Sequence, residues 1–92
     1  MAEVIVSPAA TKEFDALPRP IQARILAIYE RLEDWPAVSG AKPLRGKLAG
    51  HYRIRTGDYR VQFRVIAENP DASTPEQVIV EKVGHRDGFY ED

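Results

Sequence analysis

The 92-residue chain contains no cysteine, and this absence excludes several kinds of protein. Without thiols there is no disulfide framework, no thiolate metal site and no cysteine nucleophile. Only two histidines occur, His51 and His85, and they are too far apart for a metal-binding spacing such as His-x-x-x-His. The sequence also lacks a P-loop and a Gly-x-Ser-x-Gly motif. We therefore expect neither a metal ion nor any other cofactor.

Long apolar runs are missing as well. No stretch approaches the ~20 apolar residues that a membrane-spanning helix requires. The first residues, MAEVIVSPA, have neither the basic start nor the long apolar segment of a secretion signal. We therefore expect a cytoplasmic protein with no membrane contact, folded as one domain over residues 1–92.

The chain as a whole has little excess charge of either sign, but one segment is strongly basic. The net charge is −1. Residues 42–65 nevertheless carry seven basic side chains and one acidic side chain, a local charge of +6, which leaves −7 for the rest. A local patch affects the binding of a polyanion more than the total charge does, so nucleic-acid binding stays possible.

Two helices are predicted after a short strand over residues 2–7. Ser7 followed by Pro8 is typical of a helix start, with a hydroxyl cap and proline at the first helical position. The first helix is expected over residues 8–17 and the second over residues 20–35, before Pro36. The second contains apolar side chains at steps of three and four: Ile21, Ile25, Ile28, Leu32 and Trp35.

Three further strands are predicted over residues 51–55, 59–66 and 77–84. A tight turn is expected at residues 56–58 and a looser turn at 68–76, whereas residues 37–50 are expected to form a loop. The predicted class is α+β with the element order β-α-α-β-β-β. We expect a helical hairpin packed on one face of a small twisted antiparallel sheet.

The first two of these strands alternate between apolar and basic side chains. Side chains in a strand point to opposite faces in turn, so the apolar set is expected to face the helices. The other face would hold His51, Arg53, Arg55, Arg60, Gln62 and Arg64. Such a surface suits a polyanion, because arginine forks match phosphate geometry. Alternatively, it is a solvated face whose arginines cover apolar surface or pair with acidic residues.

A second cluster, VGHRDGFY, follows directly on the last predicted strand. Within six residues it supplies a titratable group in His85, a fixed positive charge in Arg86 and a ring for base stacking in Tyr90. The alternative is a tail whose Phe89 or Tyr90 packs into the core.

Together, KPLRGKLAGHYRIRTGDYRVQFRV (residues 42–65) and VGHRDGFY resemble the RelE/ParE superfamily of bacterial type II toxins, on its RelE side. The shared features are Leu-Arg-Gly, Tyr-basic-Ile-basic, a short turn, Tyr-Arg with alternating apolar residues, and a closing His-Arg. The resemblance covers essentially the whole chain and implies the RelE/ParE toxin fold. It also implies a ribosome-dependent, metal-independent endoribonuclease that cleaves mRNA in the A site of the 70S ribosome. The implied partner is a small cognate antitoxin from an adjacent gene, and operator DNA is reached only through that antitoxin.

The resemblance also implies site residues. Arg53 and Arg55 match a basic pair on the first hairpin strand, and Arg60 matches the arginine after the turn. His85, Arg86 and Tyr90 match a histidine found in some branches, a phosphate-binding arginine and a tyrosine that stacks on a base, which completes the catalytic set. Further RNA-binding side chains are expected to be Lys42, Arg45, Lys47, His51 and Arg64.

The chain departs from the best-known members at the basic pair, where they carry lysine. A crowded lysine can act as a base, but arginine keeps its proton. Histidine is the side-chain type that titrates near physiological pH. We therefore favour His85 as the base that activates the ribose 2′-hydroxyl, because it adjoins Arg86.

Two other interpretations stay open. One is a ParE-like inhibitor of DNA gyrase without nuclease activity. The other is a non-catalytic member that mainly binds its antitoxin. The set formed by Arg53, Arg60, Arg86 and Tyr90 favours the nuclease, because ParE relatives generally lack it.

Overall fold

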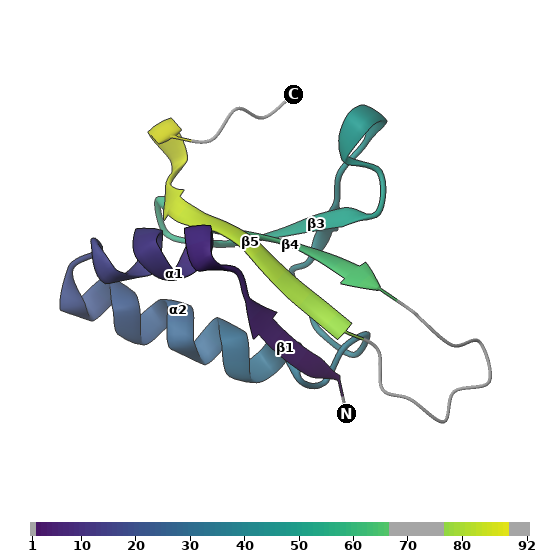
Figure 1. Ribbon diagram of the computed structural model, residues 1–92, viewed down its shortest axis with the longest axis horizontal. Helices are drawn as coiled ribbons and strands as arrows, with labels where there is room; N and C mark the ends of the chain where they lie inside the picture. The colour runs from purple at the N-terminus through teal and green to yellow at the C-terminus, as the bar shows by residue number, and fades with distance from the viewer. Residues whose placement is uncertain (1, 67–76, 89–92) are drawn as a thin grey trace.

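The computed structural model describes residues 2–66 and 77–88, and in these ranges two helices pack on one face of a five-stranded sheet (Figure 1). The predicted α+β class is confirmed, while the turn expected at residues 68–76 lies outside the described residues. The regular elements are β1 (Glu3–Val6), α1 (Pro8–Asp15), α2 (Arg19–Leu32), β2 (Lys42–Pro43), β3 (His51–Thr56), β4 (Tyr59–Ile66) and β5 (Gln77–His85), with short 3-10 helices η1 (Gly46–Leu48) and η2 (Arg86–Gly88).

The sheet is mixed rather than antiparallel, which corrects the prediction. Its strand order is β1-β5-β4-β3-β2, and β1 runs parallel to β5, with Val4 beside Val78 and Val6 beside Val80. The other neighbouring strands are antiparallel. Parallel pairing needs a long crossover connection, and here the helices and the hairpin strands provide it. Strand β2 was missed because two residues, one of them proline at the sheet edge, carry no alternation signal.

Both helices end earlier than the sequence predicts, α1 at Asp15 and α2 at Leu32. Ser7 caps α1 as expected, because its Oγ accepts a hydrogen bond of 3.1 Å from the Ala10 N–H. Helix α2 ends at Leu32 rather than Trp35. After Leu32 the backbone N–H groups of residues 33–35 bond to the carbonyl three residues back, so the chain tightens into turns before Pro36.

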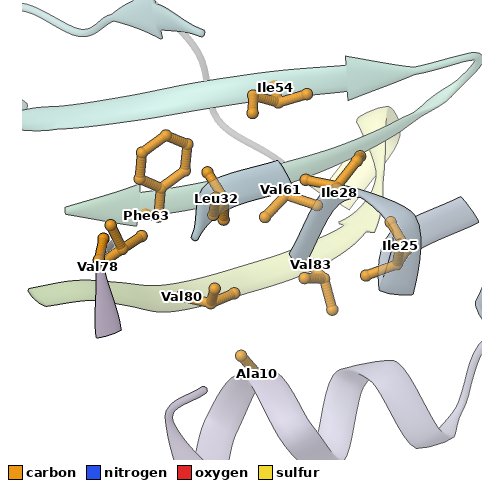
Figure 2. Close-up of a cluster of buried hydrophobic side chains, with 11 residues drawn as sticks. Ala10, Ile25, Ile28, Leu32, Ile54, Val61, Phe63, Val78, Val80 and Val83 are labelled. Carbon is orange, nitrogen blue, oxygen red and sulfur yellow. The ribbon is translucent and has the colours of Figure 1, made fainter. Parts of the chain in front are cut away.

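The core lies between the helices and one face of the sheet (Figure 2). Its buried side chains are Ala10, Ile25, Ile28, Leu32, Ile54, Val61, Phe63, Val78, Val80 and Val83, together with Ala2. Trp35 closes one end, because its ring lies edge-on to Tyr52 at 4.7 Å and to Phe63 at 5.4 Å. Because the apolar side chains of β3, β4 and β5 point to the helix-covered face of the sheet, the side chains that alternate with them lie on the opposite face.

Candidate functional site

The face of the sheet away from the helices carries the basic side chains. Across the β3–β4 ladder His51 lies opposite Arg64, Arg53 opposite Gln62, and Arg55 opposite Arg60. Residues directly opposite in a ladder share a face, so the predicted alternation is confirmed. Lys42 in β2 lies opposite Arg53 and adds a further positive charge. We call this surface the basic face: Lys42, His51, Arg53, Arg55, Arg60, Gln62 and Arg64.

The basic face is not uniformly open, in contrast to the prediction. Arg53 and Arg60 are buried, with 8% and 9% of their surface exposed. Arg55 is exposed, and the Arg64 side chain is 43% exposed. Buried arginine stays charged and requires polar interactions, and both Arg53 and Arg60 have interaction partners. The centre of the face therefore holds fixed guanidiniums, whereas its margins hold accessible ones.

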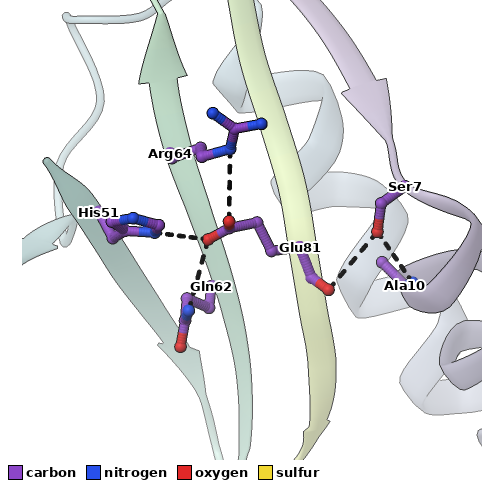
Figure 3. Close-up of polar contacts among 6 residues, drawn as sticks. All are labelled: Ser7, Ala10, His51, Gln62, Arg64 and Glu81. Atoms are coloured by element: carbon purple, nitrogen blue, oxygen red, sulfur yellow. Dashed lines mark hydrogen bonds and ion pairs between the residues drawn. The ribbon is translucent and has the colours of Figure 1, made fainter. Parts of the chain in front are cut away.

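A carboxylate, Glu81, lies within this face and was not anticipated as a site residue. Its Oε1 lies 2.6 Å from Nδ1 of His51 and 3.4 Å from Nε2 of Gln62, while its Oε2 lies 3.4 Å from Nε of Arg64 (Figure 3). The three partners come from β3 and β4, and Glu81 comes from β5. Thus one acidic side chain links three strands. Two of the basic side chains, His51 and Arg64, pair with an acid, as the alternative interpretation of this face expects.

Glu81 follows the core residue Val80 and therefore points to the basic face, and a β-bulge lies at this point of β5. Gln62 pairs with Lys82, but its neighbour Phe63 pairs with Val80, so Glu81 is the extra residue of β5. The buried valines of β5 are two residues apart at 78 and 80, but the next one is three residues further on, at 83. That change of spacing is the sequence signal by which the bulge could have been found.

Helix α1 and the residue before it hold the bulge in place. Strand β1 ends at Val6, so beyond Val80 the edge of β5 has no strand partner on that side. Ser7 fills part of the gap: its N–H donates to the Val80 carbonyl at 3.0 Å, and its Oγ donates to the Glu81 carbonyl at 3.5 Å. Next along the strand, Oε1 of Glu13 accepts from the Val83 N–H at 3.0 Å. These bonds fix the backbone of Glu81 from the helix side.

The structure separates His85 from the basic face. His85 lies opposite Tyr59, which belongs to the apolar alternation, and the two rings meet edge-on at 5.3 Å. Its Nδ1 accepts the Asp87 N–H at 3.2 Å. An Asp87 carboxylate oxygen also lies 3.4 Å from Nδ1. A hydrogen bond to that oxygen would require Nδ1 to carry a proton, whereas the bond from the Asp87 N–H requires Nδ1 to be unprotonated. An amide N–H can only donate, so we assign Nδ1 as the acceptor and place the proton of the neutral ring on Nε2.

Arg86 lies beside the β3–β4 turn. Its backbone N–H donates to the Asp58 carbonyl at 2.7 Å, and its guanidinium Nη1 lies 3.9 Å from the Asp58 carboxylate. The side chain is 59% exposed. Arg86 is thus brought to the Arg55–Arg60 end of the sheet, while His51 lies at the other end of β3.

The remaining sequence candidates occupy the margins. Arg45 and Lys47 are exposed, immediately before and within η1. In Figure 1 the segments containing η1 and η2 project on the side of the sheet away from α1 and α2. Tyr90 lies outside the described residues. Within the described part of the chain, no group of three or more His, Asp and Glu side chains is arranged to hold a metal ion.

A comparison with protein families matches residues 4–88 to the ParE toxin of the type II toxin–antitoxin system parDE. Three solved structures are similar over nearly the whole chain. The RelBE2 toxin–antitoxin complex from Mycobacterium tuberculosis has 28% identity and a TM-score of 0.73, covering 92% of this chain and 98% of that one. The RelB–RelE antitoxin–toxin complex from Methanococcus jannaschii has 26% identity and a TM-score of 0.67, with coverage of 90% and 91%.

The third structure is the isolated RelE toxin from E. coli, at 23% identity and a TM-score of 0.70, covering 92% of this chain and 84% of that one. At that identity the likeness concerns the fold. No curated protein matches the sequence significantly. Among the described residues, neither helix has the length and apolarity needed to cross a bilayer.

Proposed function

Because the chain belongs to the ParE toxin family within the RelE/ParE superfamily of type II toxins, we propose that it is a toxin of the RelE kind, which cleaves mRNA in the ribosomal A site. The observation that carries this proposal is the basic face. Four arginines and one histidine share one surface of β3 and β4, although such crowding of like charge does not stabilise a hairpin. Bound RNA would supply phosphate partners for exposed arginines such as Arg55 and Arg86 and would release counterions.

The proposed reaction needs no metal. The ribose 2′-oxygen attacks the adjacent phosphorus, the bond to the 5′-oxygen breaks, and the products are a 2′,3′-cyclic phosphate and a 5′-hydroxyl. Negative charge developing on the non-bridging oxygens of the phosphorane is stabilised by fixed cations, a role suited to the buried Arg53 and Arg60. The exposed Arg55 and Arg86 suit contacts with flanking phosphates. The requirement for a 2′-hydroxyl restricts the substrate to RNA.

The proposed partner is a small cognate antitoxin encoded next to the toxin. Several similar structures are toxin–antitoxin complexes, which supports this proposal. Acidic residues of an antitoxin would complement the +6 segment over residues 42–65, and operator DNA would be contacted through the antitoxin.

A second candidate function is inhibition of DNA gyrase without nuclease activity. It is favoured by one observation, namely that the matching family is described as the ParE toxin. The two functions predict different damage: cut mRNA in one case, and gyrase-linked DNA breaks in the other.

The deciding experiment is induced expression followed by mapping of the 5′ ends of cellular mRNA. We expect cuts phased with codons, abolished by Arg86→Ala. A matched control is Arg19→Ala, which removes the same charge at the start of α2, and it should cut like the wild type. Intact mRNA together with DNA breaks that depend on gyrase would overturn the nuclease proposal.

A further inference from the structure

The two histidines hold opposite tautomers, and this difference distinguishes their chemistry. Nδ1 of His51 lies 2.6 Å from a carboxylate oxygen of Glu81, and an ionised carboxylate only accepts hydrogen bonds. In the neutral ring of His51 we therefore assign the proton to Nδ1, which leaves the lone pair on Nε2. His85 accepts the Asp87 N–H at Nδ1, which leaves Nε2 protonated. In the neutral tautomers assigned from these contacts, only His51 has its lone pair on Nε2.

The surroundings of His51 also suit a proton acceptor. Its side chain is 22% exposed, so the ring is held by the sheet without being sealed from a substrate. The ring contacts Glu81 through Nδ1, so Nε2 lies on the side of the ring away from that carboxylate. Glu81 itself is restrained by Gln62 and Arg64 and by the backbone bond from Ser7, as Figure 3 shows. A carboxylate fixed on several sides orients the imidazole.

Position separates the two histidines further. His51 and Arg53 are alternate residues of β3 on one face, roughly 7 Å apart along the strand. Arg64 lies directly opposite His51 and its side chain is 43% exposed, so a phosphate near Arg64 lies within reach of a hydroxyl that contacts His51. The ring of His85 projects with Tyr59 toward the opposite face, so the sheet itself lies between His85 and the basic face.

From this geometry we infer that His51 is the general base of the proposed RNA cleavage and that Glu81 is its positioning residue. Nε2 of His51 takes the proton of the 2′-hydroxyl as the 2′-oxygen bonds to phosphorus. The 5′-oxygen leaves with the electron pair of the broken bond and takes a proton from water. Glu81 keeps its own charge and holds Nδ1–H of the ring throughout. The inference rests on the proposed function and replaces His85 by His51 in the role of base.

The test uses single-turnover cleavage of labelled mRNA on programmed 70S ribosomes. His51→Asn places an amide nitrogen near the position of Nδ1, so the contact with Glu81 is retained while Nε2 is lost. We expect its rate to fall by roughly 10²-fold or more, with thermal unfolding close to that of the wild type. His51→Gly, tested with added imidazole, should recover part of its lost rate, because the free base can enter the vacated position.

Glu81→Gln separates positioning from RNA binding. Removing a carboxylate makes the basic face more positive, so ribosome and RNA affinity should hold or increase. We nevertheless expect the maximal rate to fall on the order of 10-fold, because the ring loses the group that orients it. Glu30→Gln, on the exposed side of α2, makes the same change of charge and should cleave at the wild-type rate.

The outcomes are distinct. Wild-type protein that leaves ribosome-bound mRNA intact would overturn the proposed function and this inference with it. Active wild-type protein with His51→Asn within threefold of its rate would leave the nuclease in place and overturn His51 as the base. A 10²-fold loss in His85→Gln, combined with little loss in His51→Asn, would return the role to His85.

Discussion

Arg55 lies directly opposite Arg60 in the β3–β4 ladder, so two guanidinium side chains share one cross-strand position. Arg60 is buried, whereas Arg55 is exposed. Like charges directly opposite each other weaken an antiparallel pair. The pair is better explained by a requirement for anion binding than by the stability of the hairpin.

Replacing the exposed member of this pair should improve stability and impair function. For Arg55→Thr we expect the free energy of unfolding to rise by roughly 0.2–1 kcal/mol, because a like-charge contact is replaced by a residue that favours strands. The same change should reduce cleavage of mRNA on ribosomes. Urea unfolding and single-turnover rates measure the two effects. Arg45→Thr, outside the strands, is the matched control for stability and should change it little.

Binding of single-stranded RNA should depend strongly on salt. If the exposed Arg86 contacts a phosphate, Arg86→Gln should lower the slope of log affinity against log salt by about 0.7. Fluorescence anisotropy with a short labelled RNA at several salt concentrations provides the measurement. An unchanged slope would show that Arg86 makes no phosphate contact in that complex.

Ser7 should contribute both to stability and to the geometry of the bulge. Ser7→Ala removes the cap of α1 and the Oγ contact with the Glu81 carbonyl, and we expect a loss of about 1 kcal/mol in unfolding free energy. Ser7→Asp keeps a side-chain oxygen for the Ala10 N–H but has no hydroxyl for that carbonyl. If the bulge matters for the site, Ser7→Asp should unfold nearly like the wild type and yet cleave more slowly than it does.

The stability of the protein should fall at alkaline pH through Tyr29. Burial, together with the nearby Glu13 carboxylate, raises the pKa of the Tyr29 phenol from 10.0 to about 12. Between these values the unfolded chain releases the proton while the folded chain keeps it, so unfolding becomes more favourable as pH rises. Below pH 10 both states are protonated and the contribution is constant.

Tyr29→Phe isolates this effect, because the phenol oxygen is buried and has no hydrogen-bond partner among the described residues. We expect the urea midpoint of the wild type to fall relative to that of Tyr29→Phe as pH increases from 10 to 12. Parallel curves for the two proteins over this range would contradict the assigned pKa.

The sequence by itself determined the elements and the faces of the hairpin. Period-two alternation predicted which side chains of β3 and β4 meet the helices, and the register confirms it. The Ser7-Pro8 start of α1 and the turn at residues 56–58 followed from local chemistry, since Gly57 adopts the positive φ of 60° that such a turn favours. These features depend on neighbouring residues alone.

Tertiary structure alone decided how distant residues combine. Pairing of β1 with β5 ends at Val6, and there Ser7 and Glu13 bond to the bulged part of β5. Alternation from Val80 turns Glu81 toward His51, thirty residues earlier, and the bulge that follows turns His85 toward Tyr59. One extra residue in a strand reverses the faces of all that follow, because side chains alternate with period two. Local sequence can therefore supply two histidines, but only the register across three strands determines which of them meets the carboxylate.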